Sequence, residues 1–70
     1  MKKLKLYSRF ECPLCEYAAE ILAEEGIEFE EVDIEDSEEL TRRYHVKIPV
    51  ISNGEAELNW PFTADQVRSL

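Results

Sequence analysis

Two cysteines separated by two residues are the most chemically informative feature of the chain, in the segment Cys12-Pro13-Leu14-Cys15. A disulfide across so short a loop constrains the unfolded chain very little, so stabilisation alone explains the pair poorly. Two thiols at this spacing can instead react with an external disulfide, one attacking and the other resolving the mixed disulfide. The pair is therefore the candidate redox site, with Cys12 as the nucleophile and Cys15 as the resolving thiol.

The residues after Cys12 predict a helix. Pro13 suits a first helical turn, and Gly26 supplies a C-terminal stop. The apolar positions expected to face the core, spaced by three and four, are Leu14, Tyr17, Ala18, Ile21 and Leu22. Cys12 is thus expected at the helix N-terminus, where unpaired N–H groups and aligned peptide dipoles stabilise a thiolate. Its pKa should lie below the free-thiol value of about 8.5, whereas Cys15, one turn later, gains less from the dipole.

Charged neighbours act on the same thiol in opposite directions. Arg9 favours the thiolate, whereas Glu11 and Glu16 disfavour a second anion. We therefore expect a moderately acidic Cys12 thiol.

The rest of the chain predicts the elements that must position this motif. An alternating run ending near Ser8 indicates a first strand, followed by a loop over 9–11 and a second strand over 27–34. Phe29 and Val32 fall on opposite faces of that second strand, so either both faces are covered or a bulge shifts the register. Ser37 is a typical N-cap for a helix over 38–44.

The last third predicts a hairpin and a short helix. Strands over 50–52 and 56–60 flank Asn53-Gly54, which is typical of a tight two-residue turn. Thr63 and Gln66 have capping-box spacing for a final helix. The order β-α-β-α-β-β-α predicts a single α/β domain over 1–70, with a four-stranded mixed sheet flanked by helices and the first two strands parallel.

Composition bounds the partners. The chain has 70 residues, of which 44% are hydrophobic and 34% charged, which indicates a globular domain with one core. The net charge of −8 argues against nucleic acid and anionic membranes as partners. The basic start, 1–6, lacks the apolar stretch of a signal peptide. We therefore expect a cytoplasmic monomer.

A second motif is Ile48-Pro49-Val50, because a proline that opens a strand removes one ladder donor and keeps the preceding residue extended. Together with Leu6-Tyr7-Ser8-Arg9 and Cys12-Pro13-Leu14-Cys15, it resembles the glutaredoxin branch of the thioredoxin superfamily. The resemblance implies a thioredoxin-like fold and a thiol–disulfide oxidoreductase.

The resemblance also implies roles for single residues. It makes Cys12 the nucleophile and Cys15 the resolving residue, and makes Pro49 a cis-proline beside them. The implied substrate-binding residues are Arg9, Leu14, Ile48 and Pro49, where the backbone N–H and C=O of Ile48 would pair with an extended substrate.

The expected substrates are protein or small-molecule disulfides, with no bound cofactor and with glutathione as a potential co-substrate. Leu14 stands where the family commonly has tyrosine. Asn59-Trp60-Pro61-Phe62 stands where the family has a Gly-Gly-containing segment that cradles glutathione. The sequence resembles small, uncharacterised glutaredoxin-like proteins.

Two other functions remain open: a metal or iron–sulfur carrier that uses Cys12, and a redox-inactive binding module on the same fold. No metal ligand is assigned, because His45 near a helix C-terminus is more typical of a surface residue that complements the dipole. Trp60 and Phe62 are interpreted as core rather than as a substrate groove. The acidic runs are interpreted as solvated faces, although they could also steer a basic partner.

Overall fold

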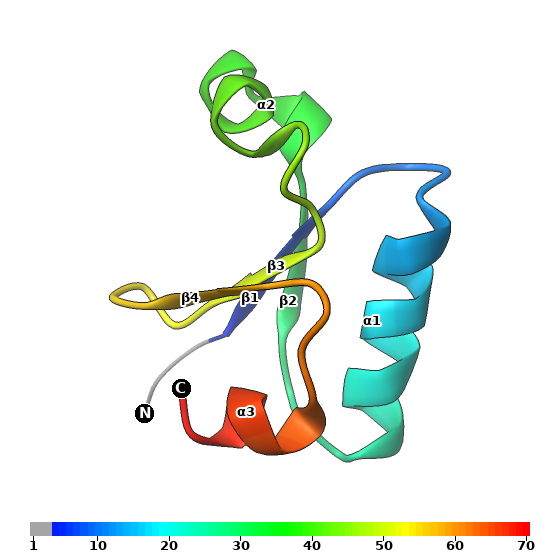
Figure 1. Ribbon diagram of the computed structural model, residues 1–70. Coiled ribbons are helices and arrows are strands. Elements are labelled where there is room, and N and C mark those ends of the chain that lie inside the picture. Colours follow the sequence, from blue (N-terminus) through cyan, green and yellow to red (C-terminus); the bar gives the residue numbers. More distant parts are fainter. Residues whose placement is uncertain (1–3) are drawn as a thin grey trace.

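The computed structural model describes residues 4–70, so the first three residues of the targeting argument lie outside the described part. The elements are β1 (Lys5–Ser8), α1 (Pro13–Glu24), β2 (Glu30–Asp33), the 3-10 helix η1 (Ile34–Asp36), α2 (Glu38–Tyr44), β3 (Val50–Ser52), β4 (Glu57–Asn59) and α3 (Ala64–Arg68) (Figure 1). The predicted order is confirmed, with η1 added between β2 and α2.

The four strands form one mixed sheet in the order β2-β1-β3-β4. β1 is parallel to β2 and antiparallel to β3, and β3 is antiparallel to β4. Ser8 therefore pairs with Asp33, and Tyr7 pairs with Val50. This register brings the chain that enters α1, the end of β2 and the start of β3 together at one end of the strands (Figure 1). We call this end of the sheet the cysteine end.

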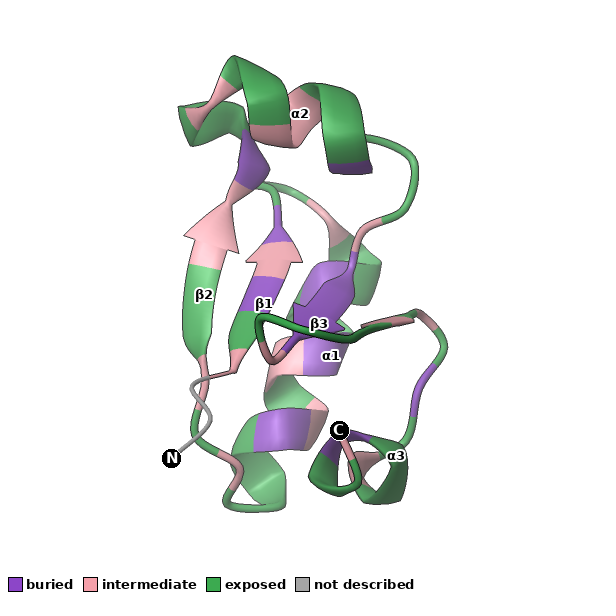
Figure 2. Cartoon of the chain, turned by 90° about the vertical axis from the view of Figure 1, so that its left-hand side faces the viewer, coloured by how far each residue is buried: buried purple, intermediate pink, exposed green. Residues whose placement is uncertain are grey.

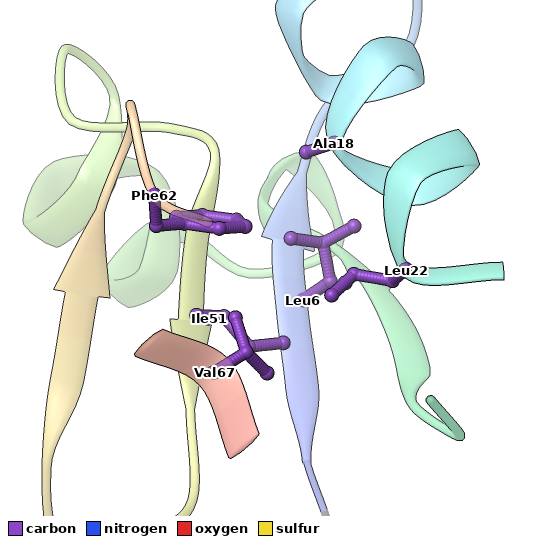
Figure 3. Close-up of a cluster of buried hydrophobic side chains, with 6 residues drawn as sticks. All are labelled: Leu6, Ala18, Leu22, Ile51, Phe62 and Val67. Atoms are coloured by element: carbon purple, nitrogen blue, oxygen red, sulfur yellow. The ribbon is translucent and has the colours of Figure 1, made fainter. Parts of the chain in front are cut away.

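Both faces of the sheet are covered. On one face α1 and α3 pack over the cluster labelled in Figure 3: Leu6, Ala18, Leu22, Ile51, Phe62 and Val67. On the other face η1 and α2 bury Ile34, Tyr44 and Val50, and Tyr7 stacks on Tyr44 with 4.6 Å between ring centroids. Phe29 packs against the first cluster, and β2 pairs with β1 in continuous register. The alternation of the second strand thus reflects two covered faces.

The connection between β3 and β4 differs from the predicted two-residue turn. Ser52 pairs with Glu57, so four residues, 53–56, link the strands. The side chain of Asn53 explains the longer loop, because its Oδ1 accepts the backbone N–H groups of Glu55 and Ala56, each at 2.8 Å. Gly54 alone takes a positive φ here, 95°. The Asn-Gly pair therefore builds a wider side-chain-stabilised loop.

The buried side of α1 is also rotated from the predicted one. The buried residues are Cys15, Ala18 and Leu22, whereas Leu14 and Tyr17 are exposed. The five predicted positions do fit a helical period. Because the side of the helix that carries Cys15 faces the core, Leu14 and Tyr17 lie at the margin of the contact with the sheet. The prediction that Leu14 and Tyr17 face the core was wrong.

Local capping signals were accurate. The Ser37 hydroxyl accepts the N–H of Leu40 (3.3 Å), and Thr63 and Gln66 form both bonds of a capping box. The second strand is shorter than predicted, since Ile34 already begins η1. Figure 2 shows the result as burial: β3 is buried along its length, while α2 turns a largely exposed side outward. Within 4–70, no helix is long and apolar enough to cross a bilayer.

Candidate active site

Cys12 is the N-cap of α1, as predicted. Its backbone is extended (φ −110°, ψ 104°), and Pro13 occupies the first helical position. The Cys12 Sγ accepts the N–H of Cys15 at 3.2 Å, and the Cys12 carbonyl accepts the N–H of Glu16 at 3.0 Å. The sulfur therefore lies where the unpaired N–H groups of a helix start favour negative charge.

Cys15 forms a disulfide with Cys12, with 5.2 Å between their Cα atoms. The two sulfurs have unequal surroundings: Cys15 is 1% exposed within the core side of α1, whereas Cys12 is only partly buried. An external disulfide can therefore reach Cys12 more readily than Cys15. This asymmetry favours Cys12 as nucleophile and Cys15 as resolving thiol, and these roles stay predictions.

Arg9 lies in the loop between β1 and α1 and is exposed. Its Nε lies 3.9 Å from Oε1 of Glu35 in η1, a contact between two half-exposed side chains. Exposed ion pairs of this kind contribute about 0–1 kcal/mol to stability, so the contact with Glu35 does not fix the position of the Arg9 side chain. The guanidinium of Arg9, three residues before Cys12 in the chain, thus makes a weak contact with η1.

An open cavity of about 300 Å³ adjoins the N-terminus of α1. Buried Ser8 contributes to its lining, together with Arg9, Phe10, Glu11, Glu16, Glu31 and Asp33. The Ser8 hydroxyl donates to Oε2 of Glu31 at 3.1 Å, and Oδ1 of Asp33 accepts the N–H of Glu35 at 2.8 Å. We call this space the acidic cavity, because four of its side chains are carboxylates.

The segment around Pro49 lies at the cysteine end, because Val50 pairs with Tyr7. The Ile48-Pro49 bond is cis, as is Trp60-Pro61. Pro49 is buried, and its carbonyl accepts the N–H of Trp60 at 3.2 Å. The N–H of Ile48, expected to face a substrate, instead donates to the carbonyl of Tyr44 at 3.2 Å. That part of the prediction is corrected, because the turn after α2 uses this donor.

The remaining candidates divide between surface and core. Leu14 is 50% exposed and lies between the cysteines in sequence. His45 is exposed at the C-terminal end of α2, and the described ranges contain no group of three or more His, Cys, Asp or Glu side chains that could hold a metal ion. Phe62 is buried as predicted, whereas Trp60 is only partly buried and contacts both Phe62 and Tyr17.

Sequence reasoning missed the acidic cavity. Of its carboxylates, only Glu31 lies in an acidic run that was interpreted as a solvated face, whereas Glu11 and Glu16 were considered only for their effect on the Cys12 thiol. A usable signal was present in the extended segment that leads into and forms β2, where Phe29, Glu31 and Asp33 alternate and therefore share one face. Because Phe29 packs in the cluster under α1, Glu31 and Asp33 must face the same helix.

Comparisons with known proteins agree with this geometry. A sequence model described as "Glutaredoxin-like domain (DUF836)" matches residues 3–70. The search of the curated proteins gave no match. The X-ray structure of protein XcR50 from X. campestris is 38% identical with a TM-score of 0.82, and the alignment covers 94% of this chain and 91% of that one.

Two further solved structures are similar at 31% identity, both with a TM-score of 0.70. One is a glutaredoxin from Brucella melitensis, with 84% of this chain and 70% of that chain covered. The other is protein Ne2328 from Nitrosomonas europaea, with 97% and 88% covered. Three findings point to the same family: the match of the family model to residues 3–70, the thioredoxin-like sheet and the disulfide at the start of α1. The chain therefore belongs to the glutaredoxin-like (DUF836) family of the thioredoxin superfamily.

Proposed function

We propose that the protein is a thiol–disulfide oxidoreductase that reduces disulfides through Cys12 and Cys15. The observation that carries the proposal is the disulfide between a partly exposed sulfur at a helix N-terminus and a buried one a turn later. The partly exposed sulfur of Cys12 is accessible to attack, whereas the buried sulfur of Cys15 is positioned to exchange with its neighbour. That asymmetry is what a two-step exchange requires.

The reduced protein starts the reaction. The Cys12 thiolate attacks one sulfur of the substrate disulfide, so a Cys12–substrate bond forms, the substrate S–S bond breaks, and the departing thiolate takes a proton from water. Cys15 then loses its proton and attacks the Cys12 Sγ. The Cys12–Cys15 disulfide forms, and the second substrate thiolate leaves. Two electrons pass from the protein dithiol to the substrate, and an external thiol reductant returns the protein to its starting state.

Four residues are proposed to hold the substrate. Arg9 offers a guanidinium beside the approach to Cys12, and Leu14 offers an exposed apolar side chain between the two cysteines. With its N–H occupied by Tyr44, Ile48 would offer its carbonyl, and Pro49 would shape that segment. Glutathione and peptide disulfides are both candidate substrates on this basis.

A single-turnover experiment tests the function without any assumption about the natural electron donor. Anaerobic, fully reduced protein is mixed with an equimolar peptide disulfide, and both products are followed by mass spectrometry. We expect one peptide disulfide to be consumed for each Cys12–Cys15 disulfide formed. Alkylation of the reduced protein, followed by peptide mapping, should label Cys12 before Cys15.

Two results would contradict the proposal. A reduced protein that leaves the peptide disulfide intact at neutral pH is not an oxidoreductase of this kind. First labelling at Cys15 would reverse the assigned roles.

A further inference from the structure

The acidic cavity is lined by the residues that directly precede the nucleophile and by a residue of the helix turn that follows it. Residues 8–11 line it and lead directly into Cys12, and Glu16 on its wall donates its backbone N–H to the Cys12 carbonyl at 3.0 Å. Glu31 and Asp33 close it from β2, which is an edge strand of the sheet. A group joined to a sulfur bound at Cys12 therefore has this cavity within reach.

The charge of the lining is one-sided. Four carboxylates face one guanidinium, and that guanidinium, Arg9, also contacts Glu35 outside the lining. The donors to Glu31 and Asp33 are a hydroxyl and a backbone N–H, which orient the carboxylates without neutralising them. The cavity thus attracts cations and repels anions, in a chain with a net charge of −8.

The aromatic wall of the cavity fits the same kind of ligand. Phe10 is 76% exposed, so most of its ring is open to a ligand. A lysine or arginine side chain can bring its charge to the carboxylates and its stem or guanidinium to the ring face. Glutathione carries two carboxylates and one ammonium and has no such side chain.

An apolar surface on the other flank of α1 points to a polypeptide. Glu16 and Tyr17 lie on opposite flanks of the buried stripe, because successive helical residues turn by about 100°. Leu14 and Tyr17 are 50% and 59% exposed, and Tyr17 packs against Trp60 with 5.9 Å between ring centroids. A chain lying across Cys12 would meet the acidic cavity on one side and this apolar surface on the other.

We propose that the preferred substrate is a polypeptide disulfide whose cysteine is flanked by lysine or arginine, and that the acidic cavity beside Cys12 selects it over glutathione. The inference rests on the proposed redox function and adds its substrate class. Charge complementarity across such a contact acts mainly on the rate of association.

The test compares the attack of reduced wild-type protein on matched probes. Two peptides of equal length share one cysteine and the same apolar residues, and differ only in lysine or glutamate on either side of the cysteine. Each peptide, and glutathione, is prepared as a mixed disulfide with thiopyridine, whose release is followed by absorbance. Each rate is divided by the rate at which mercaptoethanol, a small neutral thiol, attacks the same mixed disulfide. This division removes the intrinsic reactivity of the probe from the comparison.

We expect the lysine peptide to react at least about tenfold faster than the glutamate peptide and glutathione at low salt, and the ratio to shrink at high salt. The cavity variant carries three neutral substitutions: Glu11→Gln, Glu16→Gln and Glu31→Gln. It should reduce the peptide ratio severalfold. Any general change in thiolate reactivity cancels in that ratio.

A matched control removes the same charge at the far end of the sheet, through Glu24→Gln, Glu28→Gln and Glu55→Gln. It should keep the wild-type ratio. Equal rates for the two peptides, or a ratio that falls equally in both variants, overturn the substrate assignment and leave the redox function standing. If no probe reacts, the proposed function fails and this inference fails with it.

Discussion

The two ends of the sheet turn the chain with different residues. At the far end, positive φ angles fall on glycine, at Gly26 (70°) after α1 and Gly54 (95°) between β3 and β4. At the cysteine end, the positive φ of 60° falls on Glu11, directly before Cys12. Glycine adopts such angles without steric cost, whereas a residue with a Cβ does not.

Exposure separates the two ends in the same way. The exposed large apolar residues of the described chain lie in the β1–α1 loop, in the first half of α1 and after α2, namely Phe10, Leu14, Tyr17 and Val46. The far half of α1 instead buries Leu22 completely. At the far end, glycine takes the positive φ angles and the large apolar side chain is buried, as stability favours. The cysteine end departs from both patterns, as functional sites commonly do.

The sharpest test of this contrast is to change one cysteine at a time. Cys12→Ser should bring disulfide exchange down to the uncatalysed background, because no nucleophile remains. Cys15→Ser should leave a stable mixed disulfide on Cys12, visible as added mass in non-reducing mass spectrometry. A Cys12→Ser protein that still reduces a peptide disulfide would show that the chemistry lies elsewhere.

A second pair of variants compares the two halves of α1. Leu22→Ala removes a fully buried side chain and should lower the free energy of unfolding by about 2–5 kcal/mol. Leu14→Ala should change it by less than about 0.5 kcal/mol and should slow the reaction with peptide disulfides. Urea denaturation and the single-turnover rate measure the two effects. A larger loss of stability from Leu14→Ala than from Leu22→Ala would contradict the contrast.

The turns themselves provide a smaller effect. Gly54→Ala should destabilise by about 1–2 kcal/mol through its backbone angle alone, since no atom lies within 4 Å of the added Cβ. Glu11→Gly relieves the steric cost of a similar backbone angle, but it also raises the conformational entropy of the unfolded chain. Because these two effects oppose each other, the free energy of unfolding should stay within about 1 kcal/mol of wild type. Urea denaturation of both variants decides. Equal destabilisation would show that the turns at the two ends are not different in kind.

The smallest effect concerns Tyr44 at the end of α2. Its hydroxyl donates a hydrogen bond to Oε2 of Glu57 and so links α2 to β4. Burial, followed by this hydrogen bond and the charge of Glu57, raises the pKa of Tyr44 to about 12. The folded state therefore holds the proton more tightly than the unfolded one. This stabilisation is complete below about pH 10 and is lost as pH rises towards 12.

Ultraviolet titration should thus show one tyrosine ionising near pH 12, and Tyr44→Phe should remove it. The same variant should lower stability at neutral pH by about 1 kcal/mol. A tyrosine signal that titrates fully near pH 10 would contradict the link between α2 and β4.

Local signals in the sequence were sufficient for most elements. The Ser37 cap and the charges around it predicted α2 over 38–44, and Thr63 with Gln66 predicted the start of α3. Cys12 and Pro13 predicted the start of α1. These features depend on hydrogen bonds between near neighbours, which a sequence displays directly.

Features that depend on distant parts of the chain were predicted less well. The rotation of α1 depends on which of its sides meets the sheet, so Leu14 and Tyr17 were misplaced. The acidic cavity depends on the register of β1 with β2, which brings Asp33 beside Ser8. The donor of Ile48 was assigned outward because the turn after Tyr44 was not foreseen.

The cap of α1 has a consequence for how the reactive atom is held. In the disulfide form the Cys12 Sγ accepts the N–H of Cys15, so the contact that begins the helix also holds the sulfur that an external thiol would attack. Attack on this disulfide would cost little conformational entropy at Cys12, because the sulfur is already oriented before the encounter. Serine is itself a good N-cap, so Cys12→Ser can leave the helix start intact. The same sulfur atom therefore caps the helix and is the proposed reactive group, and replacing it with oxygen should remove the reactivity while keeping the cap.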